Sequence, residues 1–211
     1  MHSIATPKYN FSFTAASLRP ELACIVADHF LMAGDWETAR RRVLATNALQ
    51  CRSAASATRL EGELRKRLQT LTTPELLILA RSTEDDRAAI AWLAAMKHSQ
   101  MLYDFAAEVL RDKLLAHDPV LRPSDYESFV ESKSATQPGL TDLAPTSKSK
   151  IRQVLLRMLT EAGILMEGEG MGVIQRPVLS PDMVRIIAED SPRWLAGFLV
   201  PDSEIPSHLP A

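Results

Sequence analysis

Apolar residues through the first 118 positions recur every three or four residues, which is the spacing of one face of an α-helix. Leu60, Leu64 and Leu68 are one such series. Several series begin directly after a residue that caps helices well, and the caps predicted in this way are Asp35, Ser53, Thr73 and Thr83. The first helix is expected to begin near Arg19 and to end at Gly34. The pattern therefore predicts a bundle of about six helices over residues 1–118.

Two stretches of this bundle leave alternatives open. Tyr9, Phe11 and Phe13 alternate with polar residues, which fits either a short strand or an extended strap docked on the helices. Apolar positions from Ile90 to Leu110 keep the helical period, which fits either one long helix or two consecutive helices.

The carboxy-terminal region, residues 119–211, follows a junction bracketed by Pro119 and Pro123. The pattern predicts a helix around 126–130, a helical turn at 140–143 and a strong amphipathic helix over 146–162. Strand-like residues at 164–166 and 173–179 flank a glycine-rich tip, and a last helix follows from 180 to 187 before an irregular tail. The fold class expected is mainly α, with a carboxy-terminal winged-helix-like region that carries a small β-hairpin.

Composition and charge narrow the class of function. No stretch approaches the roughly 20 apolar residues that cross a bilayer, and no secretion signal is visible, so we expect a cytoplasmic protein with no membrane partner. The five histidines show no metal-ligand spacing, and the glycines at 168, 170 and 172 belong to the hairpin tip rather than to a phosphate-binding loop. We predict no enzymatic activity, no cofactor, no metal and no small-molecule substrate.

One basic segment lies on the strong helix. Between Ala144 and Thr160 there are four basic residues and no acidic ones. If the Ile151 face is buried, Ser149, Gln153 and Thr160 point outward, with Lys150, Arg152 and Arg157 on the flanks. The predicted contacts on this helix are Lys148, Ser149, Lys150, Arg152, Gln153 and Arg157. Such a face contacts phosphate oxygens, or it is simply a solvated surface. Glu167 and Glu169 at the hairpin tip would repel phosphate, so the hairpin is expected to contribute little.

A second basic segment spans residues 38–60, which contain five arginines and no acidic residues: Arg40, Arg41, Arg42, Arg52 and Arg59. Three consecutive arginines cannot all face one way on a helix, so one or two of them are expected to pair with carboxylates elsewhere. Full solvation of this segment is the alternative. Two acid-free basic segments in a chain of net charge -2 favour a polyanionic partner.

Several segments in order resemble the BrxA family of BREX (bacteriophage exclusion) defence systems. They are Gly34-Asp35-Trp36, the stretch 58–68, Trp92-Leu93 leading to 105–110, and above all 146–165, which includes Lys150-Ile151-Arg152-Gln153. The resemblance implies a small helical protein of a multi-gene phage-defence locus with a DNA-binding accessory role. It supplies no catalytic residues.

The function predicted is non-catalytic binding of double-stranded DNA, mainly through phosphates and with weak sequence preference. The eleven residues of the two basic segments named above are the predicted contacts, and other BREX proteins are expected partners. One alternative is a scaffold that docks other defence proteins through the same basic segments. Another is an RNA-binding helical protein, since arginine clusters do not choose between nucleic acids.

Overall fold

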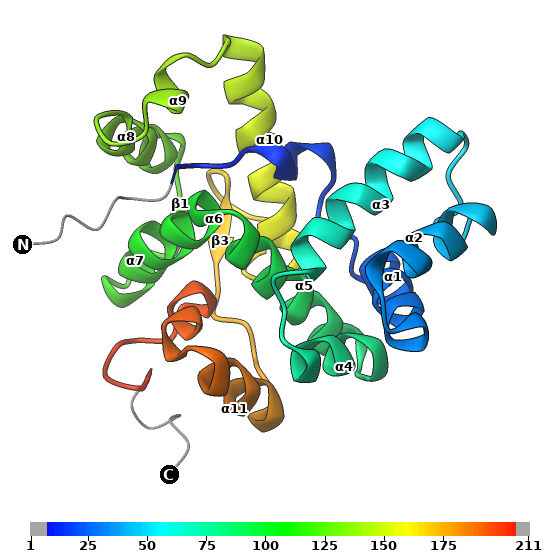
Figure 1. Cartoon of the computed structure of the whole chain (residues 1–211). Coiled ribbons are helices and arrows are strands. Elements are labelled where there is room, and N and C mark those ends of the chain that lie inside the picture. The colour runs from blue at the N-terminus through cyan, green and yellow to red at the C-terminus, as the bar shows by residue number, and fades with distance from the viewer. Residues whose placement is uncertain (1–7, 206–211) are drawn as a thin grey trace, which may run out of the picture.

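A computed structural model describes residues 8–205 and confirms a mainly α fold with one small antiparallel sheet (Figure 1). Five helices form the amino-terminal part: α1 (Pro20–Ala33), α2 (Trp36–Ala45), α3 (Ala54–Leu68), α4 (Thr73–Arg81) and α5 (Glu84–His98). α1 packs against α2, α3, α4 and α5 and lies at the centre of this group. Their apolar faces supply much of a single continuous core.

The helix starts follow the predicted capping chemistry. The Asp35 carboxylate accepts hydrogen bonds from the backbone N–H groups of Glu37 and Thr38, and Ser53 and Thr83 cap α3 and α5 in the same manner. The prediction for α4 was wrong by one residue. Thr72 is its cap, because Glu75 stands three residues later and its carboxylate accepts from the Thr72 N–H in a reciprocal capping box.

The apolar stretch after Thr83 forms two consecutive helices rather than one. α5 ends at His98, and the capping residue Ser99 has extended backbone angles. A second helix then runs continuously through α6 (Gln100–Asp104), the π-helical segment η2 (Phe105–Leu110) and α7 (Arg111–Leu115). Its Phe105 and Leu110 side chains are fully buried.

The first described residues form a docked strap, not a strand. Its only regular element is the 3-10 turn η1 (Ser12–Ala15), which packs against both α3 and α10. The buried Arg67 guanidinium of α3 donates to the backbone carbonyls of Phe13, Ala16 and Ser17. The strap is thereby tied to the helices through its own backbone oxygens.

The carboxy-terminal part contains α8 (Pro123–Ser134), α9 (Pro138–Thr141), α10 (Pro145–Glu161), α11 (Pro181–Asp190) and the 3-10 segment η3 (Pro192–Phe198). Strands β1 (Val120–Leu121), β2 (Leu165–Met166) and β3 (Gly172–Ile174) form an antiparallel sheet in the order β1-β3-β2. β1 was not predicted. The return strand was predicted over 173–179, but the strand ends at Ile174, shortly before Pro177.

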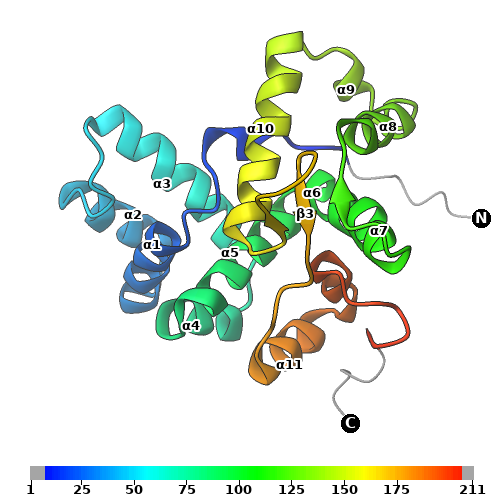
Figure 2. The same cartoon turned by 180° about the vertical axis from the view of Figure 1, so that it is seen from behind.

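In the rear view α10 lies in front of the strap, with α8 and α9 beside its upper half (Figure 2). Core residues come from both parts of the chain: Trp92 of α5 donates its indole N–H to the Gly197 carbonyl of η3 at 3.0 Å. The division into domains 1–118 and 119–211 stays a prediction. No helix within residues 8–205 has both the length and the apolar character needed to cross a membrane.

Candidate nucleic-acid interface

The outward face of α10 is the one predicted from its period. Ile151, Leu155 and Met158 are each at most 2% exposed and hold the inner face against the core. Of the six predicted contact residues on this helix, only Arg152 is half-buried, and the exposed ones are Lys148, Ser149, Lys150, Gln153 and Arg157. α10 therefore presents a polar and cationic surface over most of its length.

The amino-terminal half of α10 carries the uncompensated charge. Arg157, in the other half, lies 3.3 Å from the Glu161 carboxylate. Lys148, Lys150 and Arg152 have no carboxylate within 4 Å in the described part of the chain. No side chain caps this end of the helix, since Ala144 is the N-cap residue, so the positive end of the helix dipole adds to the cations.

The second basic segment divides into paired and unpaired arginines. Arg40 lies 3.0 Å from Glu37 and 3.7 Å from Glu61, which confirms that one of the consecutive arginines pairs with a carboxylate. Arg41 donates to the Thr38 hydroxyl at 3.0 Å. The remaining three are exposed and form no ion pair among residues 8–205: Arg42, Arg52 and Arg59.

Glu61 explains why Arg40 is not free. Its side chain is buried at 0% exposure, and Arg65 donates to one of its oxygens at 2.8 Å. Burial raises the pKa of Glu61, while Arg65 and Arg40 oppose that shift. Arg40 is thus part of a buried electrostatic contact between α2 and α3 and is the weakest of the predicted DNA contacts.

The fold turns the amino-terminal ends of α3 and α10 toward the same side of the molecule. The free, amino-terminal ends of α3 and α10 both point to the upper side in Figure 1, and the strap runs between them. Because η1 packs against both helices, it fixes their relative position. Segments separated by about a hundred residues in the sequence thus face one side together.

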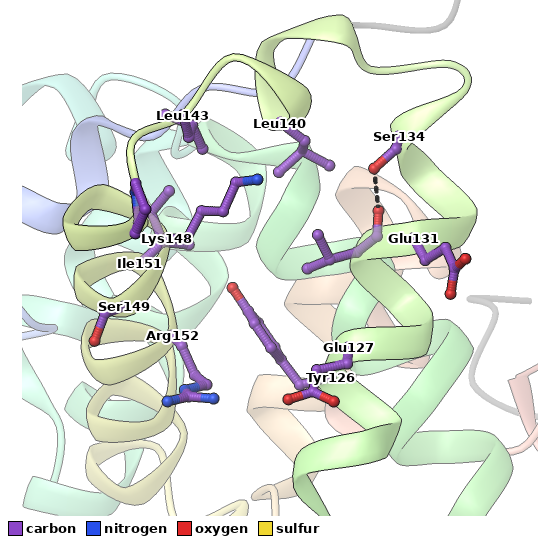
Figure 3. A pocket seen from close by; sticks show the side chains of 12 residues that line it. Tyr126, Glu127, Glu131, Ser134, Leu140, Leu143, Lys148, Ser149, Ile151 and Arg152 are labelled. Carbon is purple, nitrogen blue, oxygen red and sulfur yellow. Dashed lines mark hydrogen bonds between the residues drawn. The ribbon is translucent and has the colours of Figure 1, made fainter.

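α10 forms a ridge between two hollows. On one side, Lys150 lines a depression of about 290 Å³ together with Phe11 and Thr14 of the strap. On the other side, Lys148 and Arg152 line a larger hollow of about 500 Å³ shared with α8 (Figure 3). The sequence predicted the basic residues of this second hollow but not its α8 wall, because no local signal connects the two helices.

A buried polar cluster under the strap contains the residue types of a serine hydrolase site but lacks its geometry. The Ser12 hydroxyl lies 3.2 Å from Nε2 of His98 and 3.3 Å from Glu63, so the carboxylate contacts the serine instead of orienting the imidazole. Asn10 lies 3.0 Å from the same Nε2, and Arg67 neutralises Glu63 at 2.9 Å. The cluster holds the strap in place, and burial lowers the pKa of His98.

No group of three or more His, Cys, Asp or Glu side chains within residues 8–205 is arranged to hold a metal ion. The hairpin tip exposes Glu167 and Glu169, as predicted, and brings no cation toward α10. The hairpin therefore supplies no cationic side chain to this region, and the positive charge beside it comes from α10.

Comparison with known proteins agrees with the resemblance drawn from the residues. The model of the BrxA family matches residues 7–191. The BREX protein BrxA of Escherichia coli O9:H4 is 30% identical over 66% of this chain, and the match spans 65% of that relative, slightly less than two thirds of its length. The BREX protein BrxA of Paramagnetospirillum magneticum is 28% identical over 79% of this chain and 83% of its own.

A solved structure shares the fold. The crystal structure of an uncharacterized protein from Magnetospirillum magneticum superposes with a TM-score of 0.78, covering 92% of this chain and 98% of that one, at 21% sequence identity. The family model covers nearly all of the described residues. The chain therefore belongs to the BrxA family of BREX systems.

Proposed function

We propose that this protein is a non-catalytic accessory component of a BREX phage-defence system that binds double-stranded DNA. The observation that carries the proposal is the set of six predicted contact cations whose side chains form no hydrogen bond or ion pair among the described residues. Lys148, Lys150 and Arg152 lie on α10, Arg59 lies on α3, Arg52 directly precedes α3, and Arg42 lies on α2. Unpaired cations on a net-negative protein match a polyanion, because each can release a counterion condensed on the phosphates.

The carboxy-terminal arrangement supports entry of α10 into a groove. β1, α8, α9, α10 and the β2–β3 hairpin follow one another in the order of a winged helix, and β3 lies between β1 and β2 in the sheet. In such domains the long helix enters the major groove. The exposed face of α10 then meets phosphates on both sides of the groove, while the acidic hairpin tip stays away from them.

Sequence preference should be weak. Gln153 and Arg152 are the side chains on this face with the chemistry for bidentate base contacts, and Arg152 is half-buried in the hollow beside α8. Two such contacts at roughly 1–3 kcal/mol each reach at most the lower part of the roughly 4–10 kcal/mol range of site-specific regulators, and the half-buried Arg152 is poorly placed to supply one of them. Binding then rests mainly on phosphates.

The experiment is a salt titration of affinity for duplex DNA, single-stranded DNA and RNA of equal length. If six phosphates are contacted, the plot of log affinity against log salt concentration should have a slope of about -5.4 for the duplex. Tighter binding to RNA would transfer the proposal to that nucleic acid. Salt-independent affinity, or no duplex binding at low salt, would refute it and leave the scaffold as the better hypothesis.

A further inference from the structure

The hollow between α8 and α10 is a groove with two helical walls. The residues Tyr126 to Ser134 of α8 and Lys148 to Arg152 of α10 run in opposite directions along it, and Leu140 and Leu143 close its upper end (Figure 3). Its volume is about 500 Å³. Apolar side chains form most of its floor, and Val130 and Ile151 join the two leucines there.

Tyr126 brings an unused hydrogen-bonding group into this floor. The residue is 7% exposed, and its hydroxyl points into the space between the two helices. It donates to no acceptor within residues 8–205. The hydroxyl stays open to the groove, where an incoming backbone carbonyl or side-chain oxygen could accept a hydrogen bond from it.

The two rims of the groove carry opposite charges. Lys148 and Arg152 stand on the α10 rim, and Glu127 and Glu131 stand on the α8 rim. No ion pair joins the rims, and none of the four side chains has an oppositely charged partner within 4 Å in the described residues. The two rims therefore carry opposite charges without partners, and one bound molecule could form ion pairs with both rims at once.

The described surface of this chain offers no apolar stripe that would fill the groove of a second copy. Its exposed large apolar side chains are Met32, Leu115, Met166 and Val178, which lie on separate elements. A small apolar ligand would fill the floor but would leave the charges of both rims unpaired. A partner that is long, apolar along one side and charged along both edges fits better.

We propose that this groove binds one amphipathic α-helix of a partner protein. Apolar side chains of that helix, spaced at i, i+3 or i+4 and i+7, fill the floor. Acidic side chains on one edge of the helix meet Lys148 and Arg152, and basic side chains on the other edge meet Glu127 and Glu131. The opposite rims thereby set the direction and rotation of the bound helix, as charged flanks do in paired helices.

The test is selection of 16-residue helical peptides from a displayed random library on the full chain. We expect enriched peptides to share the apolar spacing with acidic residues on one edge and basic residues on the other. Val130→Glu, which places a charge in the floor, should weaken their binding at least tenfold. The matched control Ser128→Glu lies beside another hollow of α8 and should change affinity less than twofold.

A second arm tests the charge pattern. The double variant Lys148→Glu with Arg152→Glu should select peptides whose acidic edge is replaced by a basic one. If Val130→Glu lowers the melting temperature, Leu143→Glu blocks the same groove from the linker before α10. Peptides that bind both groove variants as tightly as wild type would overturn the proposal. The proposal would also be overturned if the enriched peptides lacked a helical spacing, if the groove bound apolar dyes but no peptide, or if the chain dimerised through the groove.

Discussion

The proposal that one duplex contacts both α3 and α10 leads to a quantitative prediction for charge removal. Lys150 and Arg59 are exposed, have no carboxylate partner in the described residues, and lie on different helices. If one duplex contacts both helices, each of the variants Lys150→Gln and Arg59→Gln removes one phosphate contact. The slope of log affinity against log salt should then change by about 0.9 per variant.

The magnitudes follow from the six unpaired cations. Six contacts give a slope of about -5.4, so raising salt from 50 to 200 mM should weaken wild-type binding about 2,000-fold. The double variant keeps four contacts and a slope of about -3.6, so the same change in salt should weaken its binding only about 150-fold. Fluorescence anisotropy with a labelled duplex at four salt concentrations measures both slopes.

The control is Arg185→Gln, which removes an equal charge from α11, where Arg185 pairs with Asp182 and Glu189. Its slope should equal that of wild type. A normal slope for Arg59→Gln alone would remove α3 from the interface and leave α10 as the binding element. Normal slopes for both single variants would refute the site altogether.

Three further predictions concern stability and selectivity. Arg67→Met should lower the free energy of unfolding by about 3–5 kcal/mol, because it leaves the buried Glu63 carboxylate without its partner and three strap carbonyls without their donor. Urea unfolding measures this loss. The control Lys66→Met, on the exposed side of α3, should cost far less. Burial lowers the pKa of His98, so the unfolded chain takes up a proton near its ordinary value of 6.5 before the folded protein does. The free energy of unfolding should therefore fall as pH drops below about 6.5, by at most about 1.4 kcal/mol per pH unit from this histidine. Unfolding curves at pH 7.5 and 5.5 should show a smaller pH dependence for His98→Gln than for wild type. An equal pH dependence in the two proteins would exclude His98 as the cause of the loss of stability. Unrelated duplexes of equal length should bind within about tenfold of one another, and recovery of one sharp motif from a random duplex pool would show that α10 reads bases strongly.

The helices could be predicted because their start signals are local. Asp35, Ser53 and Thr83 each bond to backbone N–H groups two or three residues away, so the sequence around them contains the whole interaction. The error at α4 has the same origin. Two consecutive threonines compete for the cap, and the position of Glu75 decides in favour of Thr72.

The missed features depend on partners distant in the sequence. β1 is two residues long and exists only because Val120 and Leu121 pair with Val173 and Gly172. No periodicity is visible in two residues. The partner of Arg40 on α3 was equally out of reach: the arginine run predicted that some of its members would pair, but only the packing of α2 on α3 brings Glu61 to Arg40.

In the candidate site, too, some features follow from the local sequence and others depend on contacts between distant segments. The outward face of α10 follows from its helical period, so Lys150 and Gln153 were placed correctly from the sequence. Their relation to Arg52 and Arg59 required the strap, whose η1 turn contacts α3 and α10. A charge pattern along the chain identified two basic segments, but only the tertiary structure turns the starts of α3 and α10 to one side of the molecule.

α10 takes part in both proposed surfaces, and this has a consequence for how they would act together. Lys148 and Arg152 belong to the six unpaired cations and also form one rim of the groove. A side chain that pairs with a carboxylate of a partner helix is no longer available to a phosphate. Occupation of the groove should therefore remove two of six phosphate contacts and weaken duplex binding most strongly at low salt, where each contact contributes most. Lys150 lies on the strap side of α10 and stays available, as do the arginines of α2 and α3, so a partner helix would weaken DNA binding without abolishing it.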